Sequence, residues 1–132
     1  MEEKEIIVVT AALMPIKRKY LITQRPANEH LAGKWEFPGG RLKFGETPEA
    51  CLEREIWEEL GLRIKANKLF GLSSYIYDEK MQVILIGYLC RLSSTEIKKD
   101  VNYAWVAPVQ MDDYDFCPAD IPLIKKLQEK PG

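Results

Sequence analysis

The sequence predicts a single α/β (α+β) domain over residues 1–132, with a central mixed sheet lying between helices. Its length is sufficient for one buried core and short for two. Several short β-branched or apolar runs alternate with polar turns, which is typical of strands. Two further segments, one near the middle of the chain and one at its C-terminal end, repeat apolar residues at helical spacing. Strands interrupted by helices in this way indicate a layered domain.

The N-terminal third reads as strands that are connected by a hairpin and a loop. Apolar and β-branched residues favour strands, whereas a mixture of Pro, Asn, His and Gly favours a loop. We therefore expect, in order, a buried strand at residues 6–13, a hairpin connection at 14–19, a return strand at 20–24, a loop at 25–34, and a short apolar piece at 35–38 that Gly39-Gly40 closes.

The clearest helix is predicted at Pro48–Leu60. Thr47 is a good N-cap, and proline is favoured at the first helical position. Gly61 can adopt the left-handed conformation that ends a helix. The core-facing stripe repeats every four residues and consists of Leu52, Ile56 and Leu60.

The C-terminal half is predicted to contain two long strands followed by shorter elements. The long strands are expected at residues 68–77 and 81–92, joined by a polar turn at Asp78-Glu79-Lys80. After them we expect a short strand at 103–106, a helical turn at 108–114 and a terminal helix at 118–130. The terminal helix places Leu123, Ile124 and Leu127 on one side.

Composition excludes several classes of protein. The chain has 19 Lys and Arg against 20 Asp and Glu, a net charge of -1, which argues against binding polymeric nucleic acid through bulk electrostatics. No apolar run is long enough for a membrane span. Three scattered cysteines, a single histidine and an acidic N-terminus without a secretory signal favour a cytoplasmic protein over a disulfide or zinc scaffold.

Three glutamates on the central helix form an unusual acidic cluster. Glu55, Glu58 and Glu59 stand at positions i, i+3 and i+4, so their side chains emerge on one face and repel one another. Such a cluster is often only a solvated acidic surface. A hard divalent cation such as Mg²⁺ or Mn²⁺ would also resolve the repulsion, because it prefers carboxylate oxygens and substrate phosphates.

The surroundings of this cluster favour the metal interpretation. Residues 40–62 read Gly-x5-Glu-x7-Arg-Glu-Ile-x-Glu-Glu-x-Gly-Leu without a gap. This segment resembles the signature of the Nudix hydrolase superfamily at every specified position, and nine such positions over twenty-three residues are highly specific. The resemblance implies a Nudix-type α/β/α sandwich. It also implies divalent-metal-dependent hydrolysis of a nucleoside diphosphate linked to another group.

The resemblance assigns roles to individual residues. In similar enzymes the metal, Mg²⁺ or alternatively Mn²⁺, is held by the residues that match Glu55, Glu58, Glu59 and the backbone carbonyl of Gly39. Arg54 would orient the glutamates through charge-assisted hydrogen bonds. Glu46 would support this arrangement without binding the metal itself.

The general base that activates water is expected to be Glu55. Some family members place this base outside the signature. Asp100 stands near the position at which MutT-like proteins carry an extra metal-linked glutamate, although the spacing is one residue short. It can equally be an exposed loop acid.

Further segments are similar to the MutT branch, which cleaves nucleoside triphosphates to a monophosphate and pyrophosphate. They are Gln24-Arg25-Pro26, residues 35–40 and residues 118–122. In that branch the base lies between the position of Phe37, the start of the terminal helix and the strand that carries Arg25. Arg41 matches a basic residue that would contact the phosphates. His30 matches a MutT-like histidine, and both Arg25 and His30 can alternatively be ordinary surface residues.

Asp120 bears on the choice of base. The MutT type usually has Asn here, whereas Ala-Asp-Ile-Pro looks more like the cytidine triphosphate pyrophosphohydrolases. A carboxylate accepts hydrogen bonds, so it suits the exocyclic amine of cytosine, or N1–H and the amino group of guanine or 8-oxoguanine. The alternative is a helix N-cap.

Other functions remain as alternatives. Tyr75 and Tyr77 could stack an adenine of a dinucleoside polyphosphate. ADP-ribose is disfavoured because no proline occurs between Pro48 and Pro108, where that group has its marker. A non-catalytic nucleotide-sensing domain would typically lose signature glutamates, and all are present. We expect a nucleotide substrate, no membrane or nucleic-acid partner, and a monomer or weak homodimer.

Overall fold

A four-stranded mixed sheet forms the centre of the computed structural model, which describes residues 3–98 and 100–129. β1 (Glu5–Leu13) runs parallel to β7 (Met81–Leu92) over its whole length. β5 (Gly39–Arg41) pairs antiparallel with the other side of β1, and β6 (Ile64–Tyr77) pairs antiparallel with β7. The order is therefore β5-β1-β7-β6, the central mixed sheet expected from the sequence.

A smaller sheet is built around β3 (Lys19–Gln24). β2 (Pro15–Ile16), β4 (Trp35–Glu36) and β8 (Tyr103–Val106) all pair antiparallel with β3. The β3–β4 pairing brings the loop that precedes β5 back toward the central sheet.

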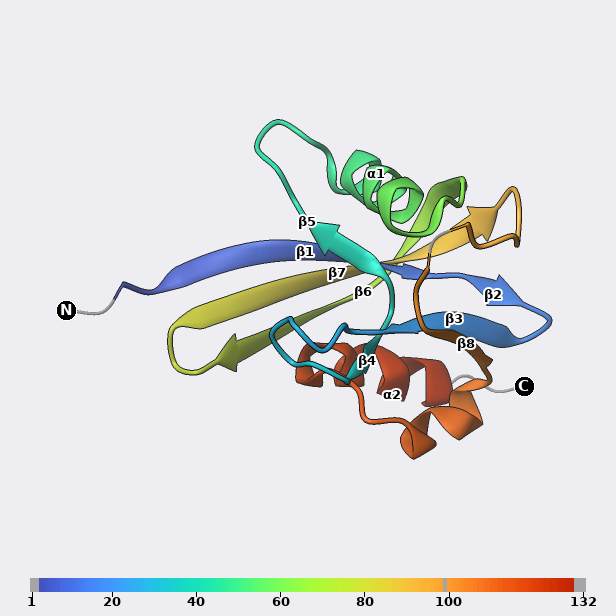
Figure 1. Cartoon of the computed structure of the whole chain (residues 1–132). Helices are drawn as coiled ribbons and strands as arrows, with labels where there is room; N and C mark the ends of the chain where they lie inside the picture. Colours follow the sequence, from blue (N-terminus) through green and yellow to red (C-terminus); the bar gives the residue numbers. More distant parts are fainter. Residues whose placement is uncertain (1–2, 99, 130–132) are drawn as a thin grey trace.

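Helices lie on the two sides of the central sheet, as Figure 1 shows. α1 (Pro48–Leu60) has the predicted bounds, with Thr47 Oγ1 accepting a hydrogen bond from the Ala50 N–H and Gly61 in the left-handed region at φ +69°. α2 (Ile121–Glu129) follows the short 3-10 helices η1 (Pro108–Asp113) and η2 (Pro118–Asp120). No helix among the described residues has the length and apolar character to span a membrane.

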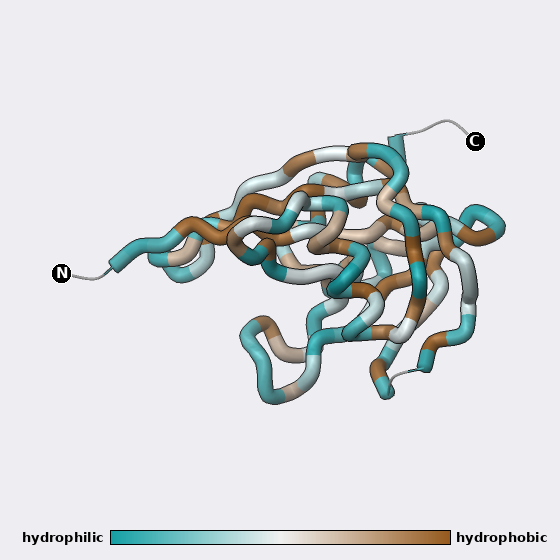
Figure 2. The backbone as a smooth tube through the Cα atoms, turned by 90° about the horizontal axis from the view of Figure 1, so that it is seen from above, coloured by the Kyte–Doolittle hydropathy of each residue, from teal (hydrophilic) through white to brown (hydrophobic). Residues whose placement is uncertain are grey.

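The alternation of the strands divides the buried side chains into two cores. One core joins α1 to one face of the sheet and includes Met14, Leu52, Ile56 and Leu60. The other lies on the face toward α2 and contains fifteen buried residues, among them Leu13, Phe37 and Leu123. Figure 2 shows hydrophobic and hydrophilic residues alternating along much of the chain, with hydrophilic residues frequent in the outer loops.

The larger differences from the expected elements concern β2, β5, β6 and α2, and several other ends differ by one or two residues. β6 begins at Ile64, four residues early, and Pro15–Ile16 forms a strand instead of only a connection. β5 was not expected, because two adjacent glycines have low strand propensity, and only its pairing with β1 makes it a strand. The terminal helix begins at Ile121 after a 3-10 turn, and its expected end at Lys130 lies outside the described residues.

Candidate active site

Arg54 is the centre of a network of carboxylates at the solvent side of α1. Its Nε and Nη2 donate to the two oxygens of Glu46, at 2.6 and 2.9 Å. Its Nη1 donates to Glu55 Oε1 at 2.6 Å and to Glu58 Oε1 at 3.1 Å. One guanidinium therefore fixes three of the signature glutamates, which the planar geometry of its donors permits.

The local sequence explains why these side chains meet. Glu58 lies one helical turn after Arg54, and Glu46 stands in the loop just before the N-cap, where the Lys43 N–H also donates to it at 2.9 Å. The hydrogen bonds from Arg54 and from the Lys43 backbone lower the pKa of Glu46 to about 2. The same bonds to Glu46 and Glu55 raise the pKa of Arg54 above its ordinary value. Both partners are therefore charged across the physiological pH range.

At the two glycines of β5, Gly39 and Gly40, other atoms of the protein lie very close to the backbone. A Cβ atom on Gly39 would lie 1.9 Å from the backbone oxygen of Thr10, and one on Gly40 would lie 2.0 Å from Glu55 Oε2. The carboxylate of Glu55 therefore rests directly on the backbone of Gly40. Real Cβ atoms are never found at such short distances. Residues 39 and 40 must therefore be glycine because there is no room for a side chain, and not because φ is positive.

Among the three glutamates of the acidic face of α1, Glu59 has the pKa that is shifted furthest from its ordinary value. Burial, together with the negative charges of Glu36 and Glu55, raises its pKa to about 8. These three carboxylates line one cavity with excess negative charge, a set of oxygen donors that suits a divalent cation. Within the described part of the chain, no three Asp, Glu, His or Cys side chains already converge as a metal cluster. Arg54 instead bonds one oxygen each of Glu55 and Glu58.

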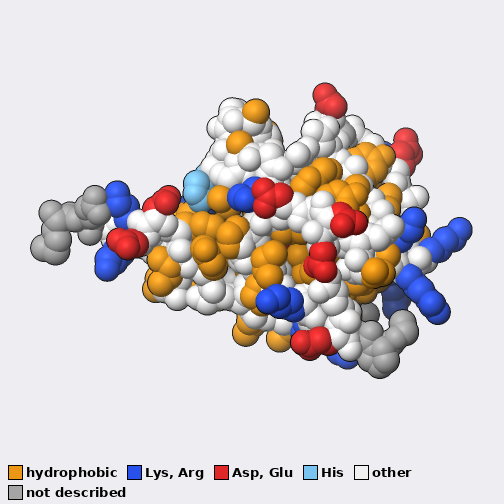
Figure 3. All heavy atoms as spheres, turned by 90° about the horizontal axis from the view of Figure 1, so that it is seen from below, with side chains coloured by type: hydrophobic (Ala, Val, Ile, Leu, Met, Phe, Trp, Pro, Cys, Tyr) orange, Lys and Arg blue, Asp and Glu red, His pale blue; other side chains and the backbone are white. Residues whose placement is uncertain are grey.

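The cavity has a volume of about 880 Å³ and lies between the two sheets. It brings together most of the residues predicted from the sequence: Arg25, His30, Phe37, Gly39, Arg41, Glu55, Glu59, Asp100 and Asp120. The other three, Glu46, Arg54 and Glu58, are not among its lining residues. Figure 3 shows hydrophobic side chains gathered on the α2 side of the molecule between charged ones. The cavity itself is lined both by carboxylates and by apolar side chains that include Ile7, Val9 and Leu85.

Asp120 lines the same cavity from η2, directly before α2. Its side chain is buried, and its Oδ2 accepts a hydrogen bond from the Phe37 N–H at 2.9 Å. Burial, and secondarily the charge of Glu36, raises the pKa of Asp120 well above its ordinary value. The carboxyl therefore connects η2 to the β4–β5 segment, a contact that an N-cap role would not provide.

Arg25 is held by three groups of the loop that follows it and of β4. Its Nε donates to the His30 carbonyl at 2.6 Å, its Nη1 to both oxygens of Glu36 at 3.2 and 3.3 Å, and its Nη2 to Glu29 at 3.1 Å. The ring of His30 meets that of Tyr77 edge to face at 5.5 Å. Arg25 and His30 are thus fixed on the cavity wall instead of extending freely into solvent.

Sequence reasoning gave no role to two residues that the structure brings to this cavity. Glu36 is a partly buried carboxylate whose pKa is raised by desolvation despite its bonds to Arg25. Thr23 is its cross-strand partner, and Thr23 Oγ1 is the one buried side-chain polar atom without a hydrogen-bond partner among the described residues. A charged residue inside the apolar run Trp35–Pro38 is a signal for Glu36. Nothing local indicates Thr23, because the strand pairing alone creates the contact.

Comparison with known proteins identifies the family. The NUDIX domain family matches residues 4–127. This chain belongs to the NUDIX family. It is an enzyme of the Nudix hydrolase type, as its relatives also indicate. The 8-oxo-dGTP diphosphatase of Escherichia coli K12 is 30% identical over 126 residues, covering 95% of this chain and 98% of the relative. The CTP pyrophosphohydrolase of the same organism is 29% identical and covers 92% and 90%.

Solved structures agree with this assignment. The DNA mismatch repair protein MutT from methicillin-resistant Staphylococcus aureus 252, named as a Nudix hydrolase, is 30% identical with a TM-score of 0.75 and covers 94% of this chain and 96% of that one. The MutT protein from Methanosarcina mazei has a TM-score of 0.79 at 22% identity, covering 97% and 96%, and shows the shared fold. The Nudix hydrolase described here therefore has the expected α/β/α architecture.

The Arg54 network yields a prediction for this Nudix hydrolase. Arg54→Lys keeps the positive charge but loses the fork that bonds Glu46 and Glu55 together, so we expect kcat to fall about 100-fold with little change in KM. Steady-state hydrolysis measures both constants. Arg63→Lys is the control, because Arg63 lies over the ring of Trp57 and not among the signature glutamates. Full activity in Arg54→Lys would show that charge alone suffices.

Proposed function

We propose that this enzyme hydrolyses nucleoside triphosphates, of the 8-oxo-dGTP/dGTP or CTP/dCTP type, to the nucleoside monophosphate and pyrophosphate. One observation carries the proposal: glutamates suited to phosphate chemistry and a buried carboxyl suited to a base line the same cavity. Relatives named 8-oxo-dGTP diphosphatase and CTP pyrophosphohydrolase, similar over almost the whole chain, support it.

Glu55, Glu58 and Glu59, with the carbonyl of Gly39, would hold Mg²⁺ or alternatively Mn²⁺. When bound, the ion neutralises phosphate oxygens and makes a water molecule more acidic. Burial and the negative charges of Glu36 and Glu55 disfavour the charged form of Glu59, and a bound cation would relieve both effects. Glu58 would need to leave its hydrogen bond to Arg54, which is long enough at 3.1 Å to be exchanged at small cost.

The attacking water would form a bond to phosphorus while the bond to the pyrophosphate oxygen breaks. Glu55 would accept the proton of this water at Oε2, because Oε1 is held by Arg54. Arg41, which lines the cavity beside the glycines, would neutralise charge on the leaving phosphates. Asp100 also lines the cavity and is a second candidate for the proton acceptor.

Phe37 and Asp120 would bind the base. Phe37 presents an apolar wall, and its N–H fixes one oxygen of Asp120. The Phe37 N–H occupies Oδ2 of Asp120, so Oδ1 would accept a hydrogen bond from the base. The exocyclic amine of cytosine, and the N1–H and amino group of guanine-type bases, are such donors. Arg25 and His30, which line the same cavity, would form the wall beside the bound base.

In the cell we propose a cytoplasmic enzyme that removes unwanted free nucleotides from the pool. The near-zero net charge supports a free nucleotide over a nucleic-acid polymer as its substrate. We infer a single catalytic domain over residues 1–132, working as a monomer or weak homodimer without a membrane partner.

A nucleotide panel tests this function. With Mg²⁺ present, pyrophosphate release is measured for 8-oxo-dGTP, dGTP, CTP, dCTP and 5-methyl-dCTP, and the nucleotide products of a dinucleoside polyphosphate are separated by chromatography. We expect turnover of one group of triphosphates. Turnover of the dinucleoside polyphosphate alone, or of nothing, would contradict the proposal.

Asp120→Ala is expected to raise KM about 10- to 100-fold for the preferred triphosphate and to reduce the discrimination between bases, with kcat less affected. The same panel measures this. Asp115→Ala, an exposed acid paired with Lys34 outside the cavity, is the control. Unchanged base preference would leave Asp120 a purely structural residue.

A further inference from the structure

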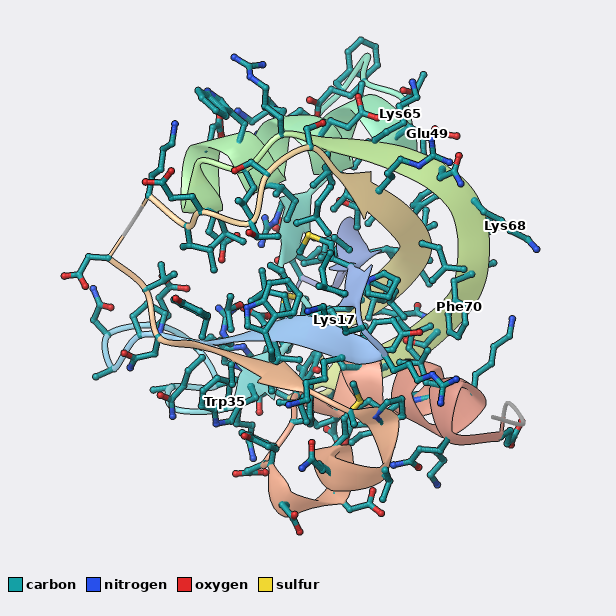
Figure 4. The ribbon with its side chains drawn as sticks, turned by 90° about the vertical axis from the view of Figure 1, so that its right-hand side faces the viewer. Lys17, Trp35, Glu49, Lys65, Lys68 and Phe70 are labelled. Atoms are coloured by element: carbon teal, nitrogen blue, oxygen red, sulfur yellow. The ribbon has the colours of Figure 1, made fainter. Side chains whose placement is uncertain are left out.

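β6 forms one edge of the central sheet. β7 pairs with it along its whole length, and no other strand pairs with it among the described residues. Figure 4 shows this strand curving along the outside of the molecule, with Lys68 projecting away from it. An edge strand presents backbone donors and acceptors to any second strand that can approach.

The second half of β6 lacks the features that usually protect an edge. Residues 69–77 contain no charged side chain and no proline. Four large apolar side chains of this run are between 42% and 61% exposed: Leu69, Leu72, Tyr75 and Ile76. The two register shifts of β6 lie before Gly71, so Gly71–Tyr77 is a regular strand. Lys65, Lys68 and one bulge precede residue 69, and the second bulge and the bond from Lys126 to the Phe70 carbonyl lie before Gly71.

Charges of opposite sign flank the uncharged run. Lys65 and Lys68 precede it, and Asp78, Glu79 and Lys80 follow it in the turn to β7, which carries a net charge of -1. All five side chains are exposed. If two such strands lie antiparallel, the basic end of each meets the acidic end of the other, whereas a parallel arrangement sets like charges together. The segment is therefore complementary to itself in one orientation.

We propose that a second copy of this chain pairs with β6 in antiparallel orientation, around a two-fold axis at Ser74. In this register Leu72 of each copy lies opposite Ile76 of the other, on the same sheet face. The single extra residue at the bulge then brings Lys68 near Glu79 of the second copy. Two central sheets become one continuous sheet, and the exposed apolar residues are covered. This contact is isologous, so it closes at a dimer.

A disulfide at the axis tests this register. Residues directly opposite on antiparallel strands have Cα atoms about 4.5–5.5 Å apart, within the range for a disulfide. Ser74→Cys should therefore form a covalent dimer under mild oxidation about tenfold faster than Ser94→Cys, an exposed control outside any strand. The three native cysteines are buried as free thiols and add little background. Equal rates for the two variants would overturn the proposal.

Sedimentation over a range of concentrations tests the apolar and charged parts of the contact. We expect the wild type to associate as a dimer and Ile76→Lys to weaken the association at least tenfold. Val109→Lys, at an exposed apolar residue of η1, should leave it unchanged. Lys68→Glu should weaken the dimer, and adding Glu79→Lys should restore it. A wild type that remains monomeric at all concentrations, or a lack of restoration by the charge exchange, would contradict the proposal.

Discussion

Gly40→Ala is expected to abolish hydrolysis in a protein that still folds. The new Cβ would lie 2.0 Å from Glu55 Oε2, so the carboxylate must leave its place beside β5. That carboxylate is the end of a flexible side chain, and its displacement costs the fold little. We expect kcat to fall about 1,000-fold, equivalent to about 4 kcal/mol of activation free energy. Steady-state hydrolysis and thermal unfolding measure the two effects.

Gly39→Ala is the matched comparison, with the opposite result expected. Its Cβ would lie 1.9 Å from the Thr10 carbonyl oxygen, which belongs to the backbone of β1 and cannot rotate away. The ladder between β1 and β5 must therefore open, and we expect the variant to lose several kcal/mol of stability or to remain unfolded. Similar melting temperatures for the two variants, or full activity in Gly40→Ala, would contradict this expectation. Either result would show that Thr10 or Glu55 can move away from the added Cβ atom at little cost.

Glu58→Gln is expected to reduce kcat about 1,000-fold with little loss of stability. Glu58 is half-exposed, and its one hydrogen bond, from Arg54, can also be accepted by the amide oxygen of glutamine. The change therefore removes one negative charge without creating a cavity or an unpaired buried group. It weakens the proposed cation site while Arg54 keeps Glu46 and Glu55 in place.

Kinetics at increasing Mg²⁺ concentrations measure this effect, and a higher concentration for half-maximal activity is expected in Glu58→Gln. Glu49→Gln is the control on the same helix, since Glu49 lies in the first turn of α1 and outside the cavity. Wild-type activity in Glu58→Gln would remove this residue from the proposed cation site. Equal losses in both variants would indicate a general effect of charge on α1.

Local interactions explain which parts of the fold the sequence predicts well. The bounds of α1 follow from the Thr47 cap, the apolar stripe and Gly61, all of which act within one or two helical turns. β7 and β8 also have the expected ends. Among the elements that differ, β5 and the first part of β6 belong to strands whose extent depends on a distant partner. A strand that gains its hydrogen bonds from residues thirty positions away has no complete local signal.

The candidate site divides in the same way. The signature residues 40–62 are contiguous in the sequence, so their pattern indicates family and chemistry before any fold is known. The pairing of Thr23 with Glu36 and the hydrogen bond from Phe37 to Asp120 join residues up to 83 positions apart. Side-chain type suggested a role for Asp120, but its depth of burial could not be deduced from neighbouring residues.

By itself, the sequence determined the fold class, the family and the acidic face of α1, because these depend on helical spacing and on a contiguous motif. The tertiary structure alone decided that Glu55 rests on Gly40, that Glu36 and Thr23 enter the cavity, and that an uncharged edge of β6 stays open. Each of these depends on strand pairing and on burial. Pairing and burial are set by the whole chain, since they require partners that only the folded arrangement brings within contact distance.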